Sequence, residues 1–118
     1  MREKVILLLP LTYNDGSAVA KEAMEQILQE LFVEFGGYTV AGEVEGAYAM
    51  RSGAKQVDTC LEVWITVESD DDSLNRLRRM VAWFAAVLRQ ETMYFERTGS
   101  KVEFIAPDSS TQELNEQG

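Results

Sequence analysis

Two long runs of alternating apolar and polar residues limit what this chain can fold into more than any other feature. They span Tyr38–Met50 and Val57–Val67, and the segment Arg51–Gln56 separates them. Because successive side chains of a strand point to opposite faces of a sheet, the runs predict a long β-hairpin with one apolar face. A helical pattern ending at Phe35-Gly36-Gly37 precedes the hairpin, so we expect helices to cover that apolar face.

The other segments complete a β-α-β-β-α-β order. The patterns predict strands over Val5–Leu9, Thr92–Glu96 and Lys101–Ile105, and helices over Ser17–Phe35 and Asp71–Arg89. This order is typical of an α+β, ferredoxin-like sandwich, with an antiparallel sheet, two helices on one face and a small extra C-terminal strand. We expect one domain over residues 1–106 and a disordered polar tail over residues 107–118.

Composition excludes several kinds of active site. The chain has no histidine and a single cysteine, Cys60, which excludes imidazole catalysis, histidine-ligated zinc and an internal disulfide. Its 20 acidic and 11 basic residues give a net charge of −9, which disfavours binding to nucleic acid or to an anionic membrane. The first apolar run is too short for a signal peptide or a membrane span, so we expect a cytoplasmic protein. No cofactor motif is present, and Arg51–Lys55 lacks the spacing of a P-loop.

The candidate binding surface is the hairpin face that points away from the helices. Regular alternation places four carboxylates there, together with a tryptophan: Glu43, Glu45, Asp58, Glu62 and Trp64. A six-residue loop sets Glu45 opposite Glu62, and a slip of two residues sets Glu43 there instead. Because like charges opposite one another are destabilising, this face is either well solvated or neutralised by a partner, a raised pKa or a divalent cation. Oxygen ligands of this kind suit magnesium, calcium or manganese.

Trp64 shares this predicted face with small residues, namely Cys60, Ala41, Ala47 and Ala49. A tryptophan among small side chains favours packing across a homodimer, with stacking on a flat ligand as the alternative. Cys60 has no basic neighbour in the sequence that would lower its pKa, which makes it a poor candidate nucleophile.

The two helices carry opposite charges. Glutamates dominate the first helix and arginines the second, so side-by-side packing would make them complementary. Met80, Trp83 and Val87 add a second apolar stripe to the second helix, typical of either a wide buried face or a subunit contact.

Four short motifs resemble a group of small bacterial proteins of unknown function, some of them secreted lipoproteins. The motifs are Asp15-Gly16-Ser17, Gly36-Gly37-Tyr38-Thr39-Val40, Gly46-Ala47-Tyr48 and Arg89-Gln90-Glu91. The group has no established activity, and this chain lacks the lipidated N-terminal cysteine. The resemblance draws attention to Tyr48, Gln90 and Glu91.

These patterns favour a non-enzymatic binding or interaction module that forms a homodimer through its open sheet face. The alternative is a small enzyme or ligand sensor with a carboxylate-lined dimer cleft that uses Tyr48 or Arg51. A pocket between the sheet face and a partner subunit that holds two converging carboxylates and an arginine would favour this alternative, whereas a flat or fully buried face would favour the interaction module. A further alternative is an acidic DNA-mimic inhibitor of the phage or plasmid type, which the basic second helix disfavours.

Overall fold

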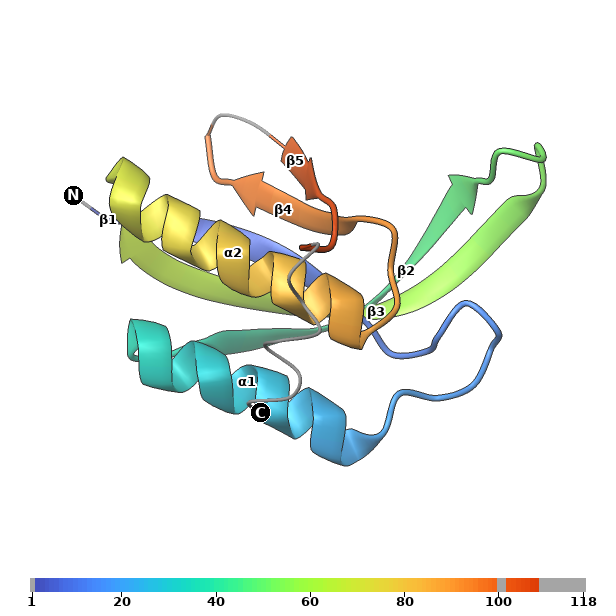
Figure 1. Cartoon of the computed structure of the whole chain (residues 1–118), viewed down its shortest axis with the longest axis horizontal. Helices are drawn as coiled ribbons and strands as arrows, with labels where there is room; N and C mark the ends of the chain where they lie inside the picture. Colours follow the sequence, from blue (N-terminus) through green and yellow to red (C-terminus); the bar gives the residue numbers. More distant parts are fainter. Residues whose placement is uncertain (1, 100–101, 109–118) are drawn as a thin grey trace.

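Five strands form one antiparallel sheet in the order β2-β3-β1-β4-β5 (Figure 1). This computed structural model describes residues 2–99 and 102–108. The strands are β1 (Arg2–Pro10), β2 (Thr39–Ala49), β3 (Lys55–Glu68), β4 (Met93–Arg97) and β5 (Val102–Ile105), and the helices are α1 (Lys21–Phe35) and α2 (Asp71–Val87). The element order and the sheet order confirm the predicted ferredoxin-like fold, with β5 as the small extra strand. The predicted polar tail lies outside the described residues from position 109 onward.

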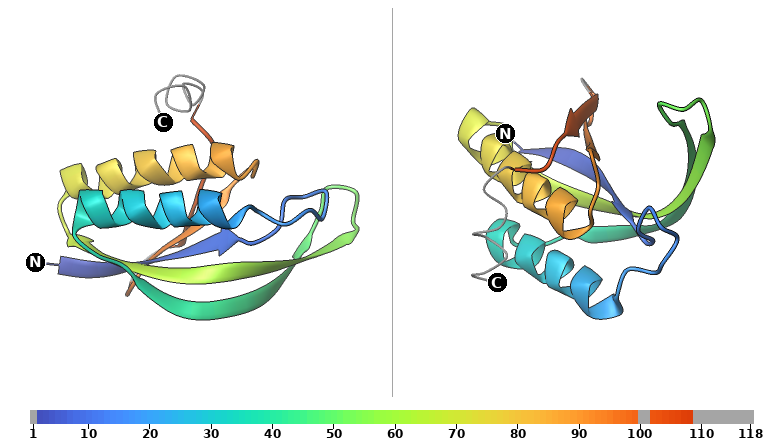
Figure 2. Two further views of the ribbon diagram at one scale, coloured as in Figure 1. Left: turned by 90° about the horizontal axis from the view of Figure 1, so that it is seen from below. Right: turned by 45° about the vertical axis from the view of Figure 1, so that its right-hand side comes forward.

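Both helices lie on the same face of the sheet, side by side (Figure 2). Alternate residues of β1, β3 and β4 point toward them and form the core with the apolar stripes of the helices. The largest fully buried side chains are Phe84, Phe95, Leu7, Leu9, Ile27, Leu31, Ile65, Leu74, Leu77 and Leu88. The two helices are also linked by an ion pair, 3.1 Å long, between Arg76 and Glu34, as their opposite charges predicted. No helix within the described residues is long and apolar enough to cross a membrane.

Local chemistry sets the helix ends. Gly36 adopts a left-handed conformation, with φ of 85°, and ends α1 where the Gly-Gly pair predicted. The start of α1 is four residues later than predicted, because Asp15 accepts hydrogen bonds from both the backbone and the hydroxyl group of Ser17 and holds it in a turn. Asp70 caps α2 by accepting a hydrogen bond from the Ser73 backbone at 2.7 Å. The positive φ of Arg89, 57°, is incompatible with the predicted helix end at that residue.

A β-bulge in β2 changes which side chains share a face. Val40 pairs with Val63 and Gly42 pairs with Glu62, so Ala41 is an extra residue without a partner on β3. Beyond it, Glu43 pairs with Leu61 and Glu45 with Thr59. Leu61 and Thr59 point to one face of β3, and Glu62 and Trp64 point to the other. The prediction that Glu43 and Glu45 share a face with Glu62 and Trp64 is therefore wrong.

The loop end of the β2–β3 hairpin bends out of the plane of the rest of the sheet (Figure 2). The helices pack on β3, β4 and β5, and the hairpin end is left largely uncovered on both faces, with Met50 and Val57 about half exposed. We call the face of the sheet opposite the helices the open face. It carries Ile6 and Leu8 of β1, Cys60, Glu62 and Trp64 of β3, and Tyr94 of β4.

Candidate functional site

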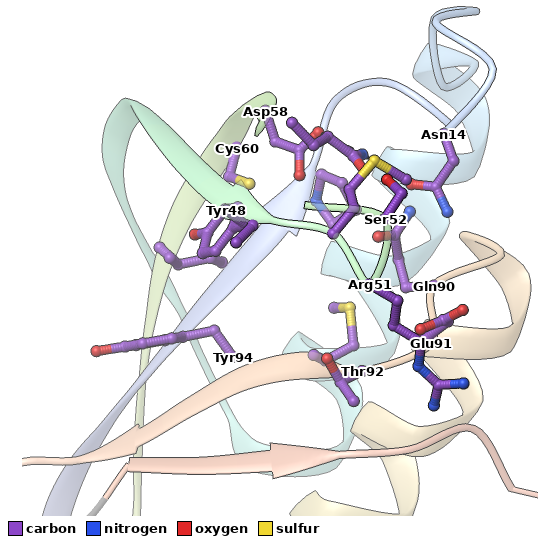
Figure 3. Close-up of a pocket in the computed structure, with 16 residues that line it drawn as sticks. Asn14, Tyr48, Arg51, Ser52, Asp58, Cys60, Gln90, Glu91, Thr92 and Tyr94 are labelled. Atoms are coloured by element: carbon purple, nitrogen blue, oxygen red, sulfur yellow. Dashed lines mark hydrogen bonds between the residues drawn. The ribbon is translucent and has the colours of Figure 1, made fainter. Parts of the chain in front are cut away.

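A pocket of about 510 Å³ lies at one end of the open face (Figure 3). Three parts of the chain that are distant in sequence meet there: the loop end of the β2–β3 hairpin, the end of β1 with the turn after it, and the connection from α2 to β4. The side chains that matter most are Asn14, Tyr48, Arg51, Gln56, Asp58, Cys60, Gln90, Glu91 and Tyr94. The volume falls within the range of about 300–1,000 Å³ that small-molecule sites occupy.

One wall of the pocket is a short chain of polar side chains on β3 and the turn after β1. Gln56 donates a hydrogen bond to Oδ1 of Asp58 at 3.0 Å, and the same nitrogen lies 3.2 Å from Oδ1 of Asn14. Asn14 in turn donates to the backbone carbonyl of Arg89 at 3.5 Å. The guanidinium group of Arg89 lies 4.5 Å from the centre of the Tyr13 ring. These contacts fix the turn after β1 against the α2–β4 connection and hold Asp58 in place.

Two tyrosines from different strands line the same pocket (Figure 3). Burial raises the pKa of Tyr48, and the nearby Cys60 and Asp58 raise it further. Tyr94 donates its hydroxyl to Glu96 at 2.7 Å, and this hydrogen bond is the main cause of the raised pKa of Tyr94. Both phenols therefore stay neutral at ordinary pH and present uncharged aromatic rings to the pocket.

Cys60 lines the pocket as a buried thiol. Burial, together with the negative charge of Asp58, raises its pKa from 9.0 to about 11. The thiolate is the nucleophilic form of cysteine, and it is scarce at neutral pH at such a pKa. Cys60 therefore acts as an apolar wall, in agreement with the sequence.

The pocket brings together three of the seven predicted binding residues, namely Tyr48, Arg51 and Asp58. Strict alternation from Val40 would put Tyr48 on the helix side of β2, and the bulge at Ala41 is what places it here. Gln90 and Glu91, singled out by the resemblance, line the pocket as well. Asn14, Gln56 and Tyr94 also line the pocket and were not predicted. Tyr94 alternates with the core residues Met93 and Phe95, and that alternation was the available signal.

The remaining predicted residues lie elsewhere. Trp64 donates its indole N–H to Glu62 at 2.6 Å, and Lys4 lies 4.0 Å from the centre of the Trp64 ring. Glu62 is opposite Gly42, so the predicted clash with Glu45 or Glu43 does not occur. Within residues 2–99 and 102–108, no group of three or more histidine, cysteine, aspartate or glutamate side chains is arranged to hold a metal ion.

Comparison with known proteins finds solved structures that share the fold. No family model and no curated protein matches the sequence. A phage SAM lyase in complex with S-methyl-5'-thioadenosine is similar with a TM-score of 0.65 and 13% identity over 92% of each chain. A phage SAM lyase in the apo state has a TM-score of 0.61 and 11% identity over 91% of this chain and 89% of that one.

The divalent cation tolerance protein CutA1 from Thermus thermophilus is also similar. Its TM-score is 0.52, with 14% identity over 98% of this chain and 93% of that one. At these identities the likeness shows the shared fold alone, and the function has to be argued from the pocket.

Proposed function

We propose that the pocket on the open face binds S-adenosylmethionine (SAM) and that the chain is a lyase that releases S-methyl-5'-thioadenosine from it. One observation carries the proposal: the pocket combines two neutral tyrosine rings with a fixed carboxylate, Asp58. The likeness in fold to a SAM lyase supports it over nearly the whole chain. Two carboxylates, Asp58 and Glu91, and one arginine, Arg51, line this pocket, as the small-enzyme alternative requires, but within a single chain and not between two subunits.

The parts of SAM match the side chains of the pocket in kind. SAM has a flat adenine base, a positively charged sulfonium and an amino-acid group with a carboxylate. Tyrosine rings stack on flat bases, and Asp58 attracts a cation within a protein whose net charge is −9. Arg51, at the turn of the hairpin, supplies a guanidinium group that suits the carboxylate of the amino-acid part.

The reaction requires little from the protein beyond holding the substrate in position and excluding solvent from it. An oxygen of the substrate's own carboxylate attacks the chain carbon that is bonded to sulfur and closes a lactone. The bond between that carbon and sulfur breaks, and its electron pair goes to sulfur, which becomes neutral. Removing a cation from water raises its energy relative to a neutral product, so a partly apolar pocket favours this step. The neutral thiol of Cys60 avoids a competing alkylation of the protein by the sulfonium.

Incubation of the purified protein with SAM tests the proposal, with liquid chromatography and mass spectrometry to follow S-methyl-5'-thioadenosine. We expect product to form faster than in a protein-free control, and we expect Asp58→Asn to reduce the rate at least tenfold. Glu45→Gln is the matched control, because this exposed carboxylate lies on the other face of β2 and should leave the rate unchanged. Neither binding nor turnover of SAM by the folded wild type would overturn the proposal.

We also propose that the chain forms a homodimer through the open face, as an interaction module would. The observation that favours this is that two large apolar side chains at the hairpin end of the open face, Tyr48 and Met50, are about half exposed. β2 is an edge strand of 11 residues without proline or lysine, which natural sheets usually protect by covering it. Light scattering should give twice the 13.3 kDa of one chain. A monomer whose mass and stability do not respond to Trp64→Ala would refute this second proposal.

A further inference from the structure

Gly46 and Tyr48 are in unusually close contact on the open face of β2. A Cβ atom placed on Gly46 would lie 2.7 Å from the Tyr48 hydroxyl oxygen and 3.0 Å from two carbons of its ring. Real Cβ atoms do not approach other atoms this closely. The Tyr48 ring therefore lies back along its own strand, directly over the glycine, and any other residue at position 46 would displace it.

Space, and not backbone conformation, explains the glycine at this position. The glycines with positive φ are Gly16, Gly36, Gly42, Gly53 and Gly99, and Gly46 is not among them. Its backbone would accept alanine without strain. The atoms in the way belong to the far end of a side chain at the surface, which can rotate into solvent, so the fold should tolerate the substitution.

The contact determines how the ring is presented to the pocket. With its hydroxyl end against Gly46, the ring cannot stand upright from the strand, and Tyr48 lines the pocket (Figure 3). Tyr48 is 45% exposed, which leaves ring surface for a ligand to cover. Gly46 pairs with Asp58 across the hairpin, so the ring lies beside the residue proposed to attract the sulfonium.

We propose that Gly46 is a positioning residue that holds the Tyr48 ring flat, and that the adenine base of the ligand stacks on the free face of this ring. This inference rests on the proposed function and assigns the base-binding part of the site. Stacking of a base on an aromatic side chain strengthens binding about 5- to 100-fold, so its loss is measurable. A ring displaced by a methyl group at position 46 would lose most of it.

Calorimetric titration with SAM and with S-methyl-5'-thioadenosine tests the inference. We expect Tyr48→Ala and Gly46→Ala each to weaken binding of both compounds about tenfold or more, and Tyr48→Phe to bind as the wild type does. The double variant should bind no more weakly than Tyr48→Ala alone, because Gly46 acts through the ring. Gly37→Ala is the matched control, since nothing lies within 4 Å of a Cβ there and its φ is not positive.

Each outcome has one interpretation. If the wild type binds both compounds and Tyr48→Ala binds them equally well, the stacking inference is wrong and the proposed function stands. If Gly46→Ala weakens binding further in the Tyr48→Ala background, Gly46 does not act through the ring and its positioning role is wrong. If the folded wild type binds neither compound, both the inference and the proposed function fail. Thermal melting of every variant shows whether a loss of binding is a loss of folding.

Discussion

Gln56 donates its side-chain N–H to Oδ1 of Asp58 over 3.0 Å, from a position two residues earlier on the same strand. The same amide nitrogen lies 3.2 Å from Oδ1 of Asn14, which belongs to the turn after β1. One glutamine therefore links the hairpin to a segment that is 42 positions away in the sequence. It fixes the carboxylate at the pocket wall before any ligand arrives, and such preorganisation lowers the cost of binding.

Replacing this link tests its contribution. We expect Gln56→Ala to weaken SAM binding about threefold to tenfold, because the net value of a protein hydrogen bond is about 0.5–1.5 kcal/mol. Isothermal titration calorimetry measures the change. Gln29→Ala, on the exposed side of α1, is the control and should bind as the wild type does. An unchanged affinity in Gln56→Ala would mean that Asp58 needs no support from its neighbour.

Cys60 should react slowly with thiol reagents. Its pKa of about 11, against the ordinary value of 9.0, leaves about 100-fold less thiolate at neutral pH than an exposed cysteine has. Because it is the only cysteine, the rate of iodoacetamide labelling at pH 8 reports on it alone. We expect labelling at least 100-fold slower in the native protein than in urea, and Cys60→Ala should retain the lyase rate. Rapid native labelling, or loss of turnover in Cys60→Ala, would assign the thiol a chemical role.

The Glu3–Arg97 pair should make stability depend on pH. The two side chains form two hydrogen bonds, of 2.6 and 3.1 Å, and the bond from Arg97 is the main cause of the lowered pKa of Glu3. A carboxyl group whose pKa is lowered by folding adds stability above its ordinary value of 4.5, and this stability is lost as the pH falls through the lowered pKa.

Thermal melts of Glu3→Gln between pH 7 and pH 3 measure this dependence. The variant should lose up to about 1 kcal/mol of unfolding free energy at pH 7 and nothing further from this pair at low pH. The difference between wild type and variant should therefore shrink as the pH falls. Glu45→Gln, whose carboxyl group is exposed, serves as the control. A difference that stayed constant down to pH 3 would contradict the assignment.

The element order was predictable because each element carries its own local pattern. The three- and four-residue spacing of apolar side chains defines both helices, and Gly36 and Asp70 mark the end of one and the start of the other. The core strands also have recognisable patterns: Leu61–Val67 of β3 alternates, and Val5–Leu9 of β1 is a continuous apolar run typical of a central strand. Such patterns depend on neighbours in the sequence, and the fold follows from them with few alternatives.

The faces of the hairpin and the composition of the pocket were not predictable in the same way. The bulge at Ala41 shifts the phase of β2 by one residue, and neither this alanine nor the glycine after it is a specific signal for a bulge. Near the hairpin end no helix covers either face of the sheet. Burial therefore does not decide which of the two alternating sets of side chains lies on the helix side. The pocket also contains Asn14 and Gln90, which lie in turns between secondary-structure elements. These turns reach the hairpin only when the whole chain folds, so no local sequence pattern predicts their contact.

The glycine after the bulge provides a direct test of that irregularity. Gly42 has φ of 137°, a conformation that residues with a side chain rarely adopt, while nothing lies within 4 Å of a Cβ there. Any cost of Gly42→Ala is therefore backbone strain, of order 1–3 kcal/mol in unfolding free energy. Gly37→Ala, with ordinary φ and equally open surroundings, should cost less than about 1 kcal/mol. Urea denaturation of both variants measures the contrast, and equal stabilities would show that β2 has no strained bulge at this position.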